Sequence, residues 1–331
     1  MRLIRTALPL ALLALTALPA VAPAKVAVGI ADNKSDMFGD ARYQQLGIKF
    51  ARINVAYDAL TDPALRPQID RWMKAAQAAG TRPLVTFDRS RRRPSYNPSP
   101  ATLAGTLKSF RKRYPFLKEF ATWNEANLSK RPETVAKWWL ALRRACPTCT
   151  VLAADLLDRP NIGVYAKRFV KAAKRTPKVW GLHNYNDANT LKTTGTRLLL
   201  KSVKGAVWFT ETGGVVSRNN GSSVKFPMSA SHAAQATKFV FSTLAKLSPR
   251  VQRVYLYHWN TGIGDGRTWD SGLIGPDDKG RPALQILAGT LGVKLIYPVP
   301  VAPVVVPEPP VEVPVAPAEV PVDPAAPAPA G

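Results

Sequence analysis

Residues 50–87, FARINVAYDALTDPALRPQIDRWMKAAQAAGTRPLVTF, contain one complete strand–helix–strand unit. The two ends, Phe50–Val55 and Pro83–Phe87, are short apolar runs with β-branched residues, which is typical of buried strands. Between them, from about Asp62 to Gly80, apolar residues recur with the period of a helix. The buried face of this helix is predicted to consist of Ile69, Trp72, Met73 and Ala76. Such a unit predicts two parallel strands joined by a right-handed crossover.

The same alternation continues on both sides of this unit. Six further strand candidates are Val26–Ile30, Phe120–Trp123, Thr150–Ala154, Val179–His183, Ala206–Thr210 and Val254–Trp259. Helical patterns between or after them include Thr134–Ala145, Ile162–Lys174, a segment from about Ser229 and Pro282–Leu291. Eight strand–helix pairs in about 270 residues match a closed (β/α)₈ barrel. An open doubly wound sheet normally has a glycine-rich turn after its first strand, and Ile30-Ala31-Asp32-Asn33-Lys34 lacks one. We therefore predict an α/β protein with a single-domain (β/α)₈ TIM barrel.

The first 24 residues have the pattern of an export signal. Arg2 and Arg5 precede an apolar run from Ala7 to Leu18, and Ala22-Pro23-Ala24 forms an A-x-A cleavage pattern. The apolar run is shorter than the roughly 20 residues that a membrane-spanning helix needs. We therefore expect a cleaved signal peptide over residues 1–24 rather than a membrane anchor, no transmembrane segment later in the chain, and a secreted, extracellular or cell-envelope location.

Residues 298–331 differ in composition from the rest of the chain. They consist almost entirely of Pro, Val and Ala, with four acidic residues and no Lys or Arg. Proline at this density excludes helices and central strands and favours an extended polyproline-type chain. This segment is predicted to be a disordered tail or an extended linker, and the two interpretations overlap. The folded body is then expected to cover residues 25–297.

The chain is strongly basic. It has 46 Lys and Arg against 22 Asp and Glu, a formal net charge of +24. Such a charge attracts anionic partners such as cell-envelope polymers, although a solvated basic surface that favours solubility is the other interpretation. The densest cluster, Arg89 with Arg91, Arg92 and Arg93, lacks the interleaved aromatic residues of a single-strand nucleic-acid track. We predict no nucleic-acid partner.

The Cys and His content argues against a metal site. Cys146 and Cys149 are the two cysteines, and in an exported protein this spacing favours a local disulfide. The three histidines, His183, His232 and His258, are not spaced to complete a zinc site. His232 and His258 are expected to be structural, with His232 on a helix surface. We predict no metal and no cofactor.

Two glutamates end predicted strands four and seven. Strand four ends in Trp123-Asn124-Glu125, and strand seven ends in Thr210-Glu211-Thr212. A parallel barrel collects its functional residues at the C-terminal ends of its strands, and strands four and seven lie on opposite sides of an eight-stranded ring. Hydrolysis of a glycosidic bond needs two carboxyl groups that face each other across the substrate.

At these residues the chain resembles the retaining glycoside hydrolases of clan A, especially the family 5 and family 39 types. An Asn-Glu pair ends strand four in those enzymes, and a single Glu ends strand seven. Arg52 matches their strand-two arginine, His183-Asn184-Tyr185 matches their His-x-Tyr motif, and Trp259 matches a tryptophan under the sugar. Phe87-Asp88-Arg89 departs from the pattern, because many family 5 members have a histidine there.

The resemblance implies a double displacement on the O-glycosidic bonds of a poly- or oligosaccharide. Glu211 is the implied nucleophile and Glu125 the acid/base, with carboxyl groups about 5–5.5 Å apart instead of the roughly 6.5–9.5 Å of inverting enzymes. The pKa of Glu125 is then expected to be raised. Arg52 and Tyr185 would hold Glu211, and Asn124 would bind the sugar 2-hydroxyl. His183 and Trp259 are further implied supporting or substrate-binding residues.

Two other functions compete with this hypothesis. A non-catalytic barrel that binds cell-envelope glycans, displayed on the Pro-rich spacer, would have the same composition. It has no need for an acid/base pair, so the two glutamates together with Tyr185 favour the enzyme. A metal-dependent barrel hydrolase would need clustered His and Asp ligands, and the sequence shows no such cluster.

Overall fold

The structure is a computed structural model that describes residues 26–219, 224–262 and 269–296. The predicted signal peptide and the predicted Pro-rich tail lie outside these residues. The chain divides into two units, Met1–Ile296 and Tyr297–Gly331, and all described residues belong to the first. Across the three described ranges, no helix combines the length and apolar character needed to span a membrane.

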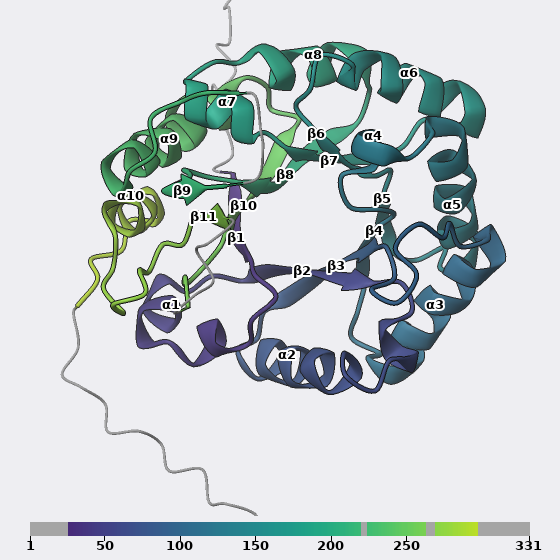
Figure 1. The fold of residues 1–331 in the computed structure, drawn as a ribbon, viewed down its shortest axis with the longest axis horizontal. Helices are drawn as coiled ribbons and strands as arrows, with labels where there is room; N and C mark the ends of the chain where they lie inside the picture. Colours follow the sequence, from purple (N-terminus) through teal and green to yellow (C-terminus); the bar gives the residue numbers. More distant parts are fainter. Residues whose placement is uncertain (1–25, 220–223, 263–268, 297–331) are drawn as a thin grey trace, which may run out of the picture. The chain divides into compact units, whose positions relative to one another are not determined.

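The first unit is a (β/α)₈ barrel, as predicted. Its parallel strands form one sheet in the order β5-β4-β3-β2-β1-β10-β8-β7-β6, drawn as the inner ring of Figure 1. The strand bounds are β1 (Ala27–Ala31), β2 (Phe50–Ala56), β3 (Arg82–Asp88), β4 (Glu119–Ala121), β5 (Thr150–Leu152), β6 (Asp155–Leu157), β7 (Val179–His183), β8 (Ala206–Thr212) and β10 (Val251–Tyr257).

The predicted fifth strand, Thr150–Ala154, is observed as the shorter β5, and a further strand, β6, follows it beyond the predicted end. β5 pairs with β4, whereas β6 pairs with β7. Ala153 and Ala154 join the two pieces and are bonded to β7: the Ala153 N–H donates to the Val179 carbonyl at 3.0 Å, and the Gly181 N–H donates to the Ala154 carbonyl at 2.9 Å. The backbone of these two alanines therefore connects the part of the ring that pairs with β4 to the part that pairs with β7, and the ring is closed.

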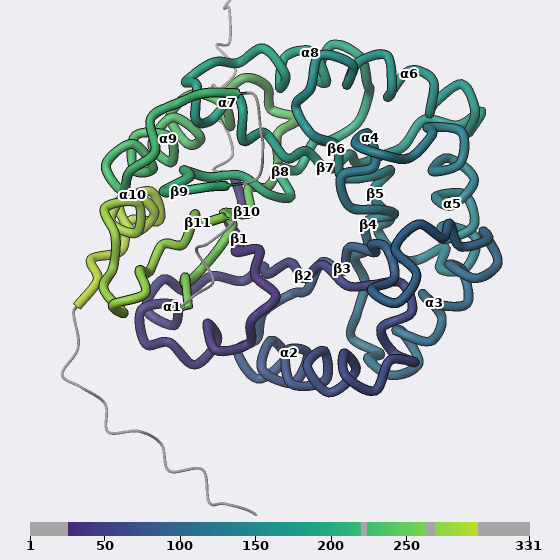
Figure 2. Tube along the Cα trace, viewed as in Figure 1, coloured from purple at the N-terminus to yellow at the C-terminus, as the bar shows by residue number. Residues whose placement is uncertain are grey.

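An outer layer of helices surrounds the strands, as the chain traces of Figures 1 and 2 show. In chain order it contains α1 (Ala41–Leu46), α2 (Arg66–Ala78), α3 (Pro100–Arg113), α5 (Pro132–Ala145), α6 (Ile162–Ala173), α8 (Thr194–Ser202), α9 (Ala230–Ser242) and α10 (Pro282–Leu291). Two short helices, α4 (Ala126–Ser129) and α7 (Tyr185–Thr190), follow β4 and β7. The predicted inner face of α2 is buried as expected, with Ile69, Trp72, Met73 and Ala76 all in the core.

The N-terminal end of the ring contains a buried ion pair, which we call the lower cluster: Glu119, Arg253 and Tyr255. Arg253 donates to the Glu119 carboxylate at 2.5 Å and to the Tyr255 hydroxyl at 2.9 Å. The rings of Phe50 and Trp208 lie 4.0 and 3.7 Å from its guanidinium group. Both charges are thus paired inside the barrel, the guanidinium group is covered by aromatic rings, and Glu119 has a second, longer contact of 3.7 Å to the exposed Arg82.

Two sequence predictions about single residues have different outcomes. Cys146 and Cys149 form the predicted disulfide, which joins the end of α5 to the start of β5 with a Cα–Cα distance of 5.3 Å. The prediction that His232 lies on a helix surface is wrong. It is buried in the first turn of α9, and its Nε2 atom lies 2.9 Å from the Asn189 carbonyl oxygen, because α7 packs against this turn.

Candidate active site

The C-terminal end of the ring contains a second set of charged side chains, which we call the upper cluster: Arg52, Glu125, Asp155, His183 and Glu211. They come from five different strands or the residue positions that follow them. Parallel strands place such side chains at one rim of a barrel. Residues far apart in the sequence thereby become neighbours, as the sequence predicted for Glu125 and Glu211.

Arg52 connects most of this cluster. Its Nη1 atom donates to Glu211 Oε1 at 2.5 Å, and Nη2 donates to Asp155 Oδ2 at 2.7 Å and Asn124 Oδ1 at 2.9 Å. Its Nε atom donates to Thr86 Oγ1 at 2.9 Å. Burial by itself would lower the pKa of Arg52, but the carboxylates of Asp155 and Glu211 outweigh burial and raise it. The guanidinium group is therefore a fixed cation that orients Glu211 and Asn124.

Asp155 lies beneath the site as a buried counter-ion. Besides Arg52, it accepts hydrogen bonds from Thr86 Oγ1 at 3.0 Å and Thr210 Oγ1 at 2.9 Å. Burial would raise its pKa, but the adjacent Arg52 holds it well below the ordinary value. Gly181 leaves room for this side chain, since a Cβ atom there would lie 1.9 Å from Asp155 Oδ1.

Asp155 directly follows the predicted strand Thr150–Ala154, which would put it at the end of that strand. The structure places it instead as the first residue of β6, buried within the ring. The signal that could have identified it is the apolar run Leu156-Leu157 that follows. This run shows that the strand continues past Ala154 and that an acidic residue lies inside it.

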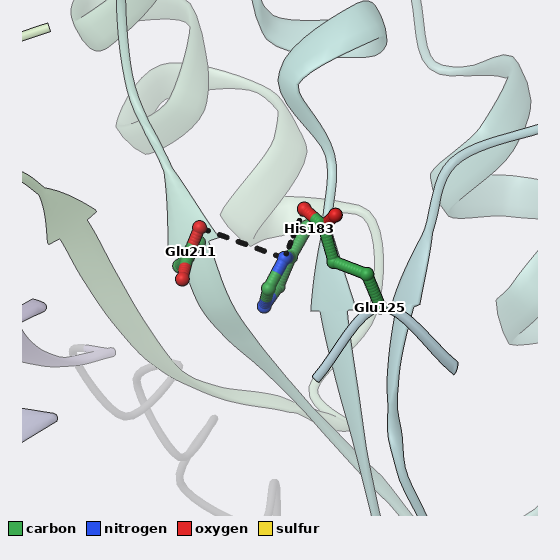
Figure 3. A group of neighbouring side chains, drawn as sticks. All are labelled: Glu125, His183 and Glu211. Atoms are coloured by element: carbon green, nitrogen blue, oxygen red, sulfur yellow. Dashed lines mark hydrogen bonds and ion pairs between the residues drawn. The ribbon is translucent and has the colours of Figure 1, made fainter. Parts of the chain in front are cut away.

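The two glutamates face each other across His183 (Figure 3). The Nδ1 atom of His183 lies 3.2 Å from Glu125 Oε1 and 3.6 Å from Glu211 Oε2. One oxygen of each carboxylate and this ring nitrogen all lie within 4.8 Å of one another. Glu125 has a left-handed backbone with φ 45°, an uncommon conformation for a residue other than glycine. The pair thus lies at one end of the ring, and the two carboxyl groups are close enough together to contact the same sugar.

The pKa of Glu125 is shifted in the direction opposite to the expected one. Burial would raise its pKa, but the hydrogen bond and charge of His183 outweigh burial and lower it. Burial would lower the pKa of His183, yet the charge of Glu211 and the contacts to Asp155 and Glu125 raise it from 6.5 to about 10. The expected rise in the pKa of Glu125 is therefore wrong for the resting state, because the extra proton resides on His183.

Tyr185 contacts the second oxygen of Glu211. Its hydroxyl donates to Glu211 Oε2 at 3.3 Å from the first position of α7. Burial and the nearby charge of Glu211 raise the pKa of Tyr185 well above its ordinary value. The raised pKa favours the protonated phenol, which donates to the carboxylate.

Trp259 does not have the predicted position under a sugar. It is completely buried, its Nε1 atom donates to Asp40 Oδ2 at 3.0 Å, and its ring packs against Tyr43 at 5.3 Å. β10 ends at Tyr257, two residues earlier than the predicted strand, so the chain has already turned away from the rim at Trp259. Its role is in the core.

Two other aromatic residues occupy the pocket wall. Tyr257 ends β10, and Trp269 begins β11 (Trp269–Asp270), which pairs with β9 (Ser217–Arg218). The ring of Trp269 meets that of Tyr185 edge to face at 4.9 Å. Trp269 was missed as a site residue because it follows the last predicted strand, Val254–Trp259, in a loop to which the sequence assigns no role. Part of that loop, residues 263–268, lies outside the described residues.

A pocket of about 800 Å³ lies above the upper cluster. This volume is within the range of small-molecule and cofactor sites. Its wall contains most of the predicted site residues together with Trp269: Arg52, Asn124, Glu125, Tyr185, Glu211 and Trp269. His183 lies between the two glutamates and is completely buried, and Trp259 is absent from the wall.

Within the described ranges, Glu125, His183 and Glu211 are also the one group with metal-ligand geometry. A histidine that binds a metal ion must be in its neutral form, with one ring nitrogen unprotonated. Here the raised pKa of His183 and the contact between Arg52 and Glu211 favour a proton and a guanidinium group as the counter-charges. The donor set therefore fits a metal ion poorly.

Sequence comparisons find no matching family model and no matching curated protein. Structural comparison finds the same fold in a family 39 glycoside hydrolase from Bacteroides cellulosilyticus WH2, with a TM-score of 0.54 and 14% identity over 83% of this chain. This chain spans 65% of the length of that enzyme.

Two further structures match over nearly their whole length. Xylanase 10B from Thermotoga maritima has a TM-score of 0.56 and 11% identity, covering 81% of this chain and 95% of its own. A GH113 beta-1,4-mannanase has a TM-score of 0.54 and 14% identity, covering 82% and 99%. At these identities the similarity establishes the shared (β/α)₈ barrel.

Proposed function

We propose that this protein is a retaining glycoside hydrolase that cleaves an O-glycosidic bond of a poly- or oligosaccharide. The observation that carries the proposal is the pair of carboxylates: oxygens of Glu125 and Glu211 lie within 4.8 Å of each other at the rim of the barrel. This upper limit falls short of the roughly 6.5–9.5 Å between the carboxyl groups of inverting enzymes, which must leave room for a water, and so favours the closer spacing of retaining enzymes.

In the proposed first step, Glu211 attacks the anomeric carbon while Glu125 gives a proton to the departing oxygen. The glycosidic bond breaks, and an ester forms between Glu211 and the sugar. In the second step, Glu125 takes a proton from water, and the resulting attack on the anomeric carbon releases the sugar and frees Glu211. Arg52 and Tyr185 contact different oxygens of Glu211 and so fix its direction of attack.

His183 would supply the proton that makes Glu125 an acid. Its Nδ1 atom is 3.2 Å from Glu125 Oε1, within reach of one proton transfer. Movement of this proton to Glu125 leaves a neutral imidazole and a carboxylic acid. A bound sugar that excludes water from Glu125 favours this shift, because desolvation disfavours the carboxylate form.

The pocket wall supports a sugar ligand. Asn124 Oδ1 is held by Arg52, which turns the amide nitrogen toward a sugar hydroxyl. Trp269 and Tyr257 offer aromatic surface in place of the predicted Trp259. The fold-sharing structures are named as a glycoside hydrolase, a xylanase and a mannanase, which supports this class of reaction. The export signal predicted over residues 1–24 supports action outside the cell or in its envelope.

The test is hydrolysis of a panel of aryl glycosides and polysaccharides by wild-type protein and Glu211→Gln. We expect activity on at least one substrate and a loss of about 10⁴-fold or more in the variant. Glu133→Gln, a carboxylate on the outer surface of α5, is the matched control and should keep wild-type activity.

NMR of the first product then reports the stereochemistry, and retention of the anomeric configuration is expected. If wild type and Glu211→Gln are equally inert on every substrate yet bind glycans equally well, the protein is a glycan-binding barrel and the proposed activity is wrong.

A further inference from the structure

The aromatic wall of the pocket has a cation beside it. In the pairing of β9 with β11, Arg218 is directly opposite Trp269, which places the two side chains on one face of the ribbon. Both residues line the pocket. Trp269 contacts Tyr185, whose hydroxyl contacts Glu211. A sugar that stacks on Trp269 next to the nucleophile therefore lies within reach of the guanidinium group.

Arg218 is half-buried and has no acidic partner among the described residues. Its guanidinium group lies 4.2 Å from the Phe226 ring, and one of its nitrogens donates to the Val224 carbonyl. Burial lowers the pKa of Arg218, which reflects a cation that has lost solvent without gaining a counter-ion. A half-buried guanidinium group without a carboxylate partner can pair with an anionic group of a ligand.

The loop between β6 and α6 adds a second cation to the wall. Arg159 is exposed, lines the same pocket and has no ion-pair partner within the described parts of the chain. Arg52, by contrast, is already paired with Glu211 and Asp155. Two arginines around the catalytic pair are thus available to a ligand, in a chain of net charge +24.

We infer that the substrate is an anionic polysaccharide, with Arg218 binding a carboxylate or sulfate group of the sugar that stacks on Trp269 and Arg159 binding a second anionic group. This inference rests on the proposed function, since it assigns the substrate of the same pocket. Arg is suited to this task because its planar guanidinium group can donate two parallel hydrogen bonds to an oxyanion and also stack on aromatic rings.

Affinity electrophoresis and calorimetry at physiological salt provide the test. The panel contains uronic-acid polysaccharides, sulfated polysaccharides and neutral xylan and mannan. All proteins carry Glu211→Gln, so that no substrate is consumed. The test variant adds Arg159→Gln and Arg218→Gln. The matched control adds Arg144→Gln and Arg175→Gln, which remove two exposed charges at the C-terminal ends of α5 and α6, the opposite end of the barrel from the pocket.

We expect an anionic polysaccharide to bind more tightly than either neutral one, with affinity reduced about tenfold or more in the test variant and less than about twofold in the control. Arg218→Lys should recover part of the affinity, because it restores the charge without the planar group. The carboxylate and sulfate arms identify which group is bound.

Equal losses in the test and control variants would show attraction by net charge alone and overturn the inference, as would tighter binding of the neutral polymers. Hydrolysis that is confined to neutral polymers overturns the inference and leaves the glycosidase proposal standing. Arg218-dependent binding without any hydrolysis supports the anionic ligand and refutes the glycosidase.

Discussion

Two buried arginines lie inside the same ring of strands, and their surroundings differ. Arg253, in the lower cluster, has one carboxylate partner and lies between two aromatic rings. Arg52, in the upper cluster, contacts two carboxylates and an amide below an open pocket. The lower ion pair is buried and partnered, whereas two carboxylates of the upper cluster, Glu125 and Glu211, line the pocket.

The comparison shows that a buried ion pair does not by itself indicate an active site. Both clusters contain a guanidinium group and a carboxylate, and in each a tyrosine hydroxyl is hydrogen-bonded to one of the charged groups. The upper cluster adds a histidine between two carboxylates and access to a pocket, and these two features permit proton transfer to a substrate. Substitutions in the upper cluster should therefore change activity, and those in the lower cluster should change stability.

After the loss of the nucleophile in Glu211→Gln, the largest expected effect is that of Glu125→Ala. Loss of the proton donor should reduce kcat/KM about 10²–10⁴-fold on substrates with a poor leaving group, and far less on dinitrophenyl glycosides, whose leaving group needs no proton. Steady-state kinetics on a series of aryl glycosides would measure this. The melting temperature should stay near that of wild type. An equal loss across all leaving groups would contradict the acid role.

Breaking the lower cluster should give the opposite result. Arg253→Met leaves the buried Glu119 carboxylate with only the exposed Arg82, whose Nη1 atom lies 3.7 Å from Oε1, and we expect a loss of about 3 kcal/mol in the free energy of unfolding. Activity per folded molecule should be unchanged. Chemical denaturation measures the loss, and the double variant Glu119→Leu with Arg253→Met should recover most of it. A loss of activity at full stability would show that the two ends of the barrel are coupled.

The proton on His183 should make the stability of the upper cluster depend on pH. The pKa of His183 is raised from 6.5 to about 10 in the folded protein, so its proton stabilises the fold fully below pH 6.5. This stabilisation is lost as pH rises through about 10. The difference in melting temperature between wild type and His183→Gln should therefore shrink across this interval.

The titratable and charged groups that face His183 are Glu125, Glu211, Asp155 and Arg52. His232→Gln provides the control, because His232 contacts a backbone carbonyl and no carboxylate among the described residues. The melting temperature of the His232→Gln variant should depend on pH as that of wild type does. A difference between wild type and His183→Gln that stays constant from pH 6.5 to 10 would argue against the proton on His183.

The smallest expected effect is that of the disulfide at the lower end of the barrel. Cys146–Cys149 closes a loop across a sequence separation of 3, so it restricts the unfolded chain only slightly. Replacing both cysteines with serine should cost roughly 2 kcal/mol or less. Thermal unfolding with and without reductant measures this. Activity should not change, since the bond lies at the end of the ring opposite the pocket.

The fold could be predicted because strand and helix periods are local properties of the sequence. Val179–His183 was predicted to the residue, and the predicted inner face of α2 is buried. The errors lie where tertiary structure overrides the local pattern. The division of β5 from β6 follows from pairing with two different neighbours, which no local pattern records.

The site could be predicted in part for a related reason. The rule that parallel strands end at one rim places Glu125 and Glu211 together without knowledge of distances. It does not give side-chain direction beyond the strand, and so Trp259 was wrongly assigned to the pocket. The proton on His183 was also beyond reach, because it depends on charges from four different elements that become neighbours only in the fold.

Ala153 and Ala154 have two duties that cannot be altered separately. They join β5, which pairs with β4, to β6, which pairs with β7, and thereby complete the ring. The same two residues set the position of Asp155 in the interior under Arg52. A one-residue deletion there would shift the following strand by a residue and exchange its inward and outward side chains. The closure of the ring and the contact between Asp155 and Arg52 would then be lost together. This short segment should therefore be among the least tolerant of insertions and deletions in any engineered or evolving version of the barrel.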